Sequence, residues 1–190
     1  ALTGKQEYKS NAVSSFKFTL EKQNKDGSWD YSITDQGSRK QIDWHQGFIL
    51  DSLMLYDEIL GLSKGAKDRL MSGAKFYKYT QFYDGKIGFW RYPKFWPIDI
   101  HNQSQGIISF SKLSSYDNSF IDSASKILEW TVKNLSDGKG NYYYRKGRFH
   151  KNKSNFIRWN QAWMLLAIST YLSSFSNLQI TNNLPSGNVK

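Results

Sequence analysis

The chain has 190 residues, of which 39% are apolar and 16% aromatic, and its formal net charge is +10. This composition is that of one folded domain rather than of a disordered chain. The absence of cysteine excludes disulfides, thiolate metal sites and cysteine nucleophiles, and it suits the cytoplasm, the location we expect. No signal peptide is visible. The longest apolar run, residues 162–172, is far shorter than the ~20 residues of a membrane span, so we expect no membrane span.

The positive charge suggests a polyanionic partner such as nucleic acid, an acidic polysaccharide or an anionic surface. Most lysines are scattered along the chain, as simple solvation would require. A dense basic cluster occurs at Lys146, Arg148, His150, Lys151 and Lys153. Because no recognition motif accompanies the charge, we expect no nucleic-acid partner.

An Asp-Gly turn followed by aromatic residues occurs three times, at intervals of roughly 55 residues. The turns are Asp26-Gly27, Asp84-Gly85 and Asp137-Gly138. Each follows an amphipathic segment, and glycine tolerates the left-handed backbone that ends a helix. The apolar stripes predict outer helices over residues 8–24, 64–81 and 117–135.

A second, more apolar helix is expected after each turn and its loop. These inner helices align on three glutamines, Gln46, Gln105 and Gln161. A small residue follows each glutamine and lets neighbouring helix backbones approach closely: Gly47, Gly106 and Ala162. The inner helices are expected to begin near Asp43, Asp99 and Arg158.

Each repeat therefore pairs an amphipathic outer helix with a buried inner one, which is the unit of an α/α toroid. We predict an all-α fold of three helical hairpins forming part of an α/α toroid, an incomplete α/α barrel, over residues 1–176. Residues 177–190 are predicted to be a flexible C-terminal tail. Three hairpins make only an arc, whose two ends lack helical neighbours. A second chain or a missing N-terminal half could close the toroid.

The loops before the inner helices carry the candidate catalytic residues. Two loops contain Asp-x-His, at Asp43 with His45 and at Asp99 with His101. If both pairs face one cavity, they could perform general acid–base chemistry, since a neighbouring carboxylate tunes histidine near neutral pH. Arg158 in the third loop could clamp a carboxylate or phosphate through two hydrogen bonds.

Helix capping is the alternative interpretation of these aspartates. Asp43 followed by Gln46 is typical of a capping box, and Asp99 could cap its own helix. Under the glutamine alignment His45 matches Ser104 rather than His101, so the two Asp-x-His motifs could be alike by accident. Two His and two Asp could also ligate zinc, but side chains two residues apart on a helix diverge, so no metal site is expected.

Aromatic residues crowd the same loops. Rings beside Asp, Arg and His resemble a carbohydrate subsite, whereas packing between helix ends is the alternative explanation. The expected substrate-binding residues are Arg158, Trp44, Trp90, Trp96, Trp159 and Asn160. No P-loop, dinucleotide fingerprint, Gly-x-Ser-x-Gly elbow or His-Glu-x-x-His motif occurs, and no cofactor is expected.

Three motifs resemble an uncharacterised microbial family encoded among surface-polysaccharide genes. They are Ile-Asp-Trp-His-Gln-Gly (42–47), Tyr-Pro through Pro-Ile-Asp-Ile-His (92–101) and Arg-Trp-Asn-Gln-Ala-Trp-Met (158–164). The resemblance covers residues 8–176 and implies an α/α toroid, but it supplies no catalytic residues. Some members carry the label delta-aminolevulinic acid dehydratase. That chemistry uses a β/α barrel with Schiff-base lysines, and this sequence has neither alternating strands nor a lysine in an apolar setting.

Two functions of different classes stay open. The first is a carbohydrate-active protein of epimerase, lyase or hydrolase type, acting on a polysaccharide or its precursor at the inner-helix mouth, with an anionic sugar or polysaccharide as partner. The second is a non-catalytic module that binds glycan or completes a toroid. The acidic pair of ordinary glycosidases is not evident, because no glutamate lies at the mouth.

Overall fold

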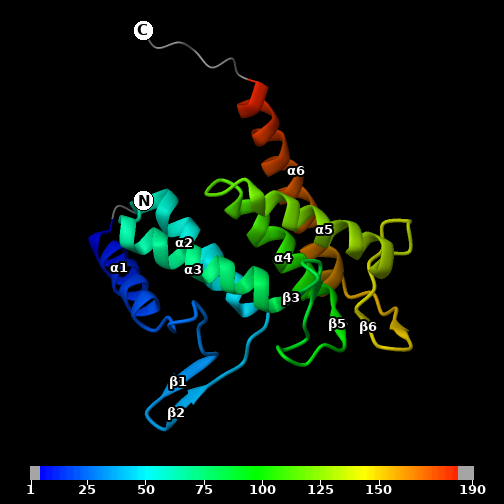
Figure 1. The fold of residues 1–190 in the computed structure, drawn as a ribbon, viewed down its shortest axis with the longest axis horizontal. Helices are drawn as coiled ribbons and strands as arrows, with labels where there is room; N and C mark the ends of the chain where they lie inside the picture. Colours follow the sequence, from blue (N-terminus) through cyan, green and yellow to red (C-terminus); the bar gives the residue numbers. More distant parts are fainter. Residues whose placement is uncertain (1–4, 184–190) are drawn as a thin grey trace.

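The computed structural model describes residues 5–183, with side chains through residue 180. Over these residues six α-helices form three hairpins, each an outer helix followed by an inner one (Figure 1). They are α1 (Gln6–Glu21), α2 (His45–Leu60), α3 (Lys64–Gln81), α4 (Ile100–Leu113), α5 (Ser119–Leu135) and α6 (Ala162–Asn183). The predicted all-α arc of three hairpins is confirmed.

The helix boundaries follow from local signals. Ser63 caps α3, because its hydroxyl accepts a hydrogen bond from the Ala66 amide at 3.3 Å. Gly61 ends α2 at a φ of 76°, a value that favours glycine. A π-helical turn (Ile157–Gln161) leads into α6, which continues to Asn183, beyond the predicted boundary at residue 176. The rest of the predicted tail, residues 184–190, lies outside the described residues.

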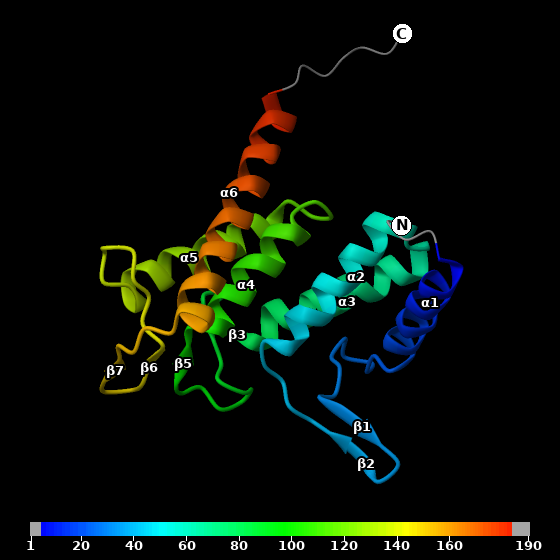
Figure 2. The same ribbon diagram turned by 180° about the vertical axis from the view of Figure 1, so that it is seen from behind.

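All described strands are short and antiparallel. Strand β1 (Ser32–Thr34) pairs with β2 (Gly37–Arg39), and β3 (Phe82–Tyr83) pairs with β4 (Ile87–Gly88). Strands β5 (Ile98–Asp99), β6 (Arg145–Lys146) and β7 (Lys151–Asn152) form a small sheet in which Asp99 lies opposite Arg145. Seen from both sides, these loops gather at the end where the inner helices begin (Figures 1 and 2).

Helix α4 is the centre of the molecule. It packs between the inner helices α2 and α6 and against the outer helix α5. Its apolar side chains are fully or almost fully buried, among them Ile107, Phe110 and Leu113. The outer helix α5 presents a stripe at helical spacing that includes Phe120, Ile127 and Leu135. By contrast α1 buries no residue completely and is attached through Phe16, whose ring stacks on Tyr56 at 4.0 Å.

The small residues after the aligned glutamines have different roles. A Cβ on Gly47 would lie 2.7 Å from Gln105 on α4, so this glycine does allow α2 and α4 to approach closely. A Cβ on Gly106 would instead strike the Phe82 ring. Ala162 is exposed. Gly106 also allows a close approach to α5, since its Cβ would lie 3.2 Å from Ile127. The prediction therefore fails for the exposed Ala162.

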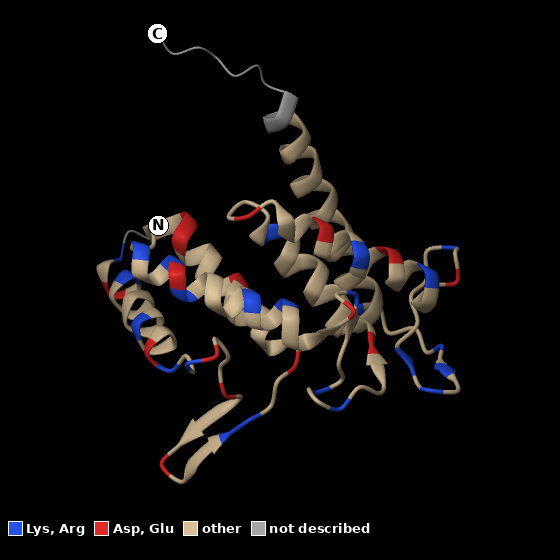
Figure 3. Ribbon diagram, in the orientation of Figure 1, with Lys and Arg blue, Asp and Glu red and all other residues tan. Residues whose placement is uncertain are grey.

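The two ends of the arc expose apolar side chains. Helix α6 carries no charged residue, and its coloured part is tan throughout in Figure 3, yet Leu165 is 68% and Leu172 56% exposed. At the other end Leu55 and Ile59 of α2 are exposed. An inner helix at the end of the arc has an inner-helix neighbour on one side only, so apolar side chains on its other side are exposed. Within the described residues, no helix is long and apolar enough to cross a membrane.

Candidate functional site

Each repeat fixes its mouth loop with one glutamine, which we call the glutamine clip. Gln46 accepts a hydrogen bond from the amide of Trp29 at 3.0 Å and donates to its carbonyl at 2.8 Å. Gln103 accepts from Gly88 N at 2.7 Å and donates to the carbonyl of Lys86 at 3.0 Å. These bonds satisfy backbone groups that would otherwise be buried without partners.

The third clip is Gln161, which makes the same pair of bonds with the backbone of Tyr142 at 3.3 and 3.0 Å. The structure thus aligns Gln46, Gln103 and Gln161, and the alignment on Gln105 was wrong. Gln105 lies two residues further along the same helix and donates to Asp51 and Ser109. With the correct alignment the repeat is regular, at about 57 residues.

The corrected alignment makes Trp44, His101 and Trp159 equivalent, since each lies two residues before its clip. Their rings are neighbours, with centroids 5.6 Å apart for Trp44 and His101 and 4.4 Å apart for His101 and Trp159. His45 corresponds instead to Asn102 and Asn160. The two Asp-x-His motifs are therefore not equivalent by repeat, and the two pairs differ in their contacts.

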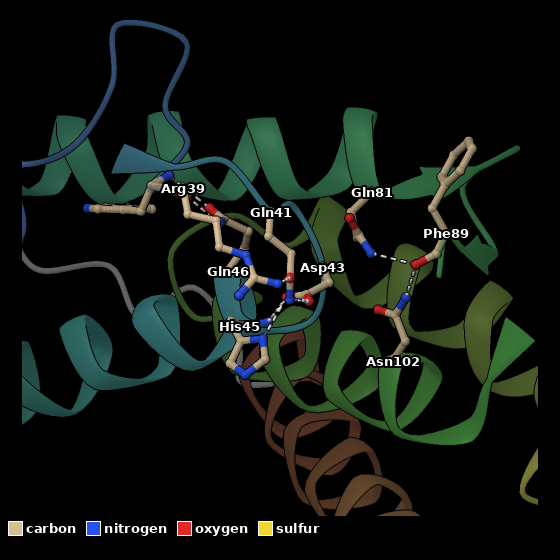
Figure 4. Close-up of polar contacts among 9 residues, drawn as sticks. Arg39, Gln41, Asp43, His45, Gln46, Gln81, Phe89 and Asn102 are labelled. Carbon is tan, nitrogen blue, oxygen red and sulfur yellow. Dashed lines mark hydrogen bonds and ion pairs between the residues drawn. The ribbon is translucent and has the colours of Figure 1, made fainter. Parts of the chain in front are cut away.

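Asp43 and His45 form a hydrogen-bonded pair. Nδ1 of His45 lies 2.6 Å from Oδ1 of the fully buried Asp43, and the His45 amide also donates to that oxygen at 3.1 Å. Gln41 donates to the other carboxylate oxygen at 2.6 Å and accepts from Arg39 at 2.7 Å (Figure 4). Because an ionised carboxylate only accepts, Nδ1 carries the proton of neutral His45 and Nε2 is left as a free base. The predicted capping box is wrong, since the side chain of Gln46 bonds to Trp29.

Asp99 has a different set of partners. Its Oδ1 accepts from the His101 amide at 2.9 Å, so the predicted cap of α4 is confirmed. The same oxygen accepts from the indole of Trp159 at 3.2 Å, and Oδ2 accepts from Nε of Arg145 at 2.6 Å. Burial raises the pKa of Asp99, against the lowering effect of Arg145. The imidazole of His101 makes no hydrogen bond with this carboxylate.

His101 is 5% exposed and lies among aromatic rings. Its centroid is 4.4 Å from that of Trp163, and neither ring nitrogen has a hydrogen-bond partner. Burial, followed by the charge of nearby His45, lowers the pKa of His101 to about 4. The ring is thus neutral at physiological pH.

A cleft of about 890 Å³ lies at the start of the π-helical turn. Its lining is mostly aromatic and cationic: Trp44, Trp90, Arg91, Tyr144, Arg145, Asn155, Phe156, Ile157, Arg158 and Trp159. Four of the predicted substrate-binding residues, Trp44, Trp90, Trp159 and Arg158, are therefore in one place. Among the described residues no group of three or more His, Asp or Glu side chains is arranged to hold a metal ion.

The other predicted site residues lie outside this lining. Trp96 is 38% exposed and packs on Phe95. Asn160 is buried and its amide ties Tyr142 to Ser154 by donating to both carbonyls, as a structural residue would.

Asp43, His45, Asp99 and His101 are also absent from the lining, and both histidines instead contact the Trp44 ring, at 5.4 and 5.6 Å. The expectation that the Asp-x-His pairs and Arg158 border one concavity is not met for this cleft. The catalytic roles of these residues stay predictions.

Sequence reasoning missed Arg145 and Arg91 as parts of this cleft. Arg145 stands next to an aromatic run, but its importance comes from pairing with Asp99, 46 residues away. Arg39 and Gln41 were missed as well, because only the folded β1–β2 hairpin brings them to Asp43. No local pattern indicates either arrangement.

A second cavity of about 600 Å³ lies toward the other ends of α2 and α4. Three of its charged groups have partners: Asp51 pairs with Lys112 at 3.2 Å, and Asp57 accepts from the hydroxyl of Tyr116 at 2.7 Å. The cleft at the mouth is the stronger candidate site, because several of its donors are free.

The fold and the position of the cleft define an α/α-toroid arc with a mouth at its inner-helix N-termini. No family model and no curated protein matches the sequence. Among solved structures the chain is similar to an unsaturated glucuronyl hydrolase from Bacillus sp. GL1, described as responsible for the degradation of glycosaminoglycan. The TM-score is 0.59 and the sequence identity 12%, over 91% of this chain and 57% of the hydrolase chain. This likeness supports the toroid fold, and the chain spans little more than half the length of that hydrolase. The resemblance to the surface-polysaccharide family stays a prediction.

Proposed function

We propose that the chain is a carbohydrate-active domain that binds an anionic sugar or polysaccharide in the mouth cleft. The observation that carries this proposal is the cleft itself, which is lined by indole and phenol rings and by guanidinium groups. The Asp43–His45 pair lies outside this lining and reaches it through the contact of His45 with the Trp44 ring. The similar fold of a glucuronyl hydrolase supports the same class of ligand.

The lining suits a sugar chemically. The C–H faces of a pyranose stack on aromatic rings, and Trp44, Trp90 and Trp159 offer three indoles. Polar side chains at the rim, such as Asn155, can bind hydroxyl groups. A cleft of this size that combines aromatic walls with placed polar and charged groups is typical of ligand sites.

The Asp43–His45 pair is the proposed source of acid–base chemistry. Nε2 of neutral His45 can accept a proton, and the buried carboxylate stabilises the imidazolium that forms. Epimerisation, elimination and hydrolysis of sugars all require such a transfer. His101, neutral and enclosed by rings, and Asp99, held by Arg145, are proposed to act on the shape of the cleft rather than as acids or bases.

A non-catalytic module is the second candidate. It is favoured by the finding that the Asp-x-His residues do not line the cleft, and by the uncovered apolar ends of the arc. In this alternative the domain binds glycan or completes a toroid with helices from another chain. A cytoplasmic location also stays a prediction.

Binding and turnover measurements separate the two candidates. Oligosaccharides of acidic and neutral type would be titrated while tryptophan fluorescence is followed, and the mixtures would be analysed for new reducing ends, double bonds or epimers. The enzyme proposal expects products that disappear in His45→Ala, with binding retained. Binding without any product would favour the module. If no sugar binds, the enzyme and the glycan-binding module are both refuted, and the toroid-completing module is the candidate that is left.

A further inference from the structure

Arg145 lines the mouth cleft and is held in place by a carboxylate and two aromatic rings. Its Nε donates to the fully buried Asp99 at 2.6 Å. Its guanidinium carbon lies 4.3 Å from the ring centroid of Trp90 and 4.2 Å from that of Tyr144. Within residues 5–183 the structure gives no partner to its two terminal nitrogens. A guanidinium fixed between two rings with free donors is preorganised to bind an anion.

Two more arginines share the cleft. Arg91 is half-buried, and its Nε is buried without a hydrogen-bond partner. Arg158 is exposed on the π-helical turn, at the outer side of the cleft. Among the lining residues there are three guanidinium groups and no carboxylate. Unpaired buried donors are costly, so a ligand that accepts hydrogen bonds here recovers that cost.

We infer that the cleft binds an acidic oligosaccharide carrying more than one anionic group, carboxylate or sulfate, with Arg145 as the anchoring residue. The inference rests on the proposed carbohydrate function and names the ligand class and the residue that selects it. Three separate cations in one cleft match a repeated acidic sugar better than a single acidic monosaccharide. Asp99 acts as a positioning residue, because it fixes the plane of the Arg145 guanidinium.

Single-stranded nucleic acid also binds to cations and aromatic rings. The structure favours a sugar over it, because the exposed basic cluster at residues 146–153 that a phosphate backbone would contact does not line the cleft. Arg148 belongs to that cluster and is exposed. It therefore provides a matched control, since Arg145→Met and Arg148→Met remove the same charge three residues apart.

The test is a titration followed by tryptophan fluorescence, because three tryptophans line the cleft. The probes are an oligogalacturonate, a sulfated oligosaccharide, a neutral glucan oligomer of equal length and a short oligonucleotide. We expect Arg145→Met to weaken binding of an acidic oligosaccharide at least ~10-fold and Arg148→Met to change it less than ~2-fold. The better of the two acidic probes identifies the anion. If loss of the Asp99 partner unfolds Arg145→Met, the exposed Arg158→Met is expected to weaken binding ~3-fold.

The results of this titration distinguish failure of the inference from failure of the proposed carbohydrate function. If the neutral oligomer binds as tightly as the acidic ones and neither arginine variant matters, the inference and the anionic character of the ligand are refuted, while a carbohydrate-binding function stands. If the oligonucleotide binds best and Arg148→Met weakens it, a nucleic acid replaces the sugar. If no sugar binds, the inference and the proposed function are both wrong.

Discussion

Nδ1 of His45 lies 2.6 Å from Oδ1 of Asp43, within a carboxylate that has no exposed surface. This contact fixes the tautomer of the imidazole. Replacing Asp43 with Asn removes the charge and should shift neutral His45 toward the tautomer protonated at Nε2, which nitrogen NMR detects without any substrate. Turnover of the acidic substrate should fall roughly 10²–10⁴-fold. Asp35→Asn, in the exposed β1–β2 turn, is the control. An unchanged tautomer in Asp43→Asn would contradict the assigned role.

Stability should depend on pH through His101. Its folded pKa is about 4 against an ordinary 6.5, because burial disfavours the charged ring. The unfolded chain therefore takes up this proton at the higher pH, and the free energy of unfolding decreases as the pH falls from 6.5 to 4. At ~1.4 kcal/mol per pKa unit the loss totals about 3 kcal/mol, with none above pH 6.5.

His101→Phe should remove this dependence, as urea unfolding across that pH range would show. Asp43, His45 and Asp99 also face or adjoin the ring, and the raised pKa of Asp99 acts in the opposite direction. Their effects cancel in the difference between His101→Phe and the natural protein. Equal pH slopes for the two proteins would refute the prediction.

The glutamine clips should contribute unequally to the free energy of unfolding, because they differ in burial. Gln103 is fully buried and also donates to the hydroxyl of Thr131 at 3.0 Å, whereas Gln161 is half-buried. Gln103→Leu leaves Gly88 N and the Lys86 carbonyl without a partner, and should cost roughly 3 kcal/mol of unfolding free energy. Gln161→Leu should cost about 1 kcal/mol, because water can replace its bonds. Chemical denaturation measures both, and equal losses would mean that the clips do not act through buried hydrogen bonds.

The uncharged face of α6 should make the isolated chain self-associate. Leu165 and Leu172 expose more than half of their surface on a helix without a charged residue. Light scattering over increasing protein concentration should show larger species, and the double variant Leu165→Glu/Leu172→Glu should stay monomeric. Val132→Glu, on the outer face of α5 and 43% exposed, is the control. A natural chain that is monomeric at every concentration would argue against a covered α6 face.

The helices could be predicted because the apolar residues of each one recur at helical spacing or form a continuous run. The stripe of α5 and the apolar run of α6 indicate outer and inner helices without knowledge of any contact. The alignment of the inner helices could not be settled this way, since Gln103 and Gln105 stand on the same helix in similar surroundings. Only the hydrogen bonds of Gln103 with Gly88 and Lys86 identify the repeat position.

The candidate site was predictable only in part. Trp44, Trp159 and Arg158 could be placed at the mouth because the start of each inner helix is visible in the sequence. Arg145 could not, because its role depends on the pairing of β5 with β6 across 46 residues. The two Asp-x-His motifs have the same residue pattern but are not equivalent, because His101 occupies the repeat position of Trp44 and Trp159.

The glutamine clips also mark the boundary between the helices and the loops that form the mouth. Each glutamine closes its loop where the loop meets the inner helix, and the chain between the two bonded positions forms a lobe at the mouth. The tip of the first lobe is open, and a Cβ added to Gly37 would meet no atom within 4 Å. A peptide tag or fluorophore inserted between Asp35 and Gln36 should therefore be tolerated. It would place a reporter on the same hairpin as Arg39, which contacts Gln41 beside Asp43.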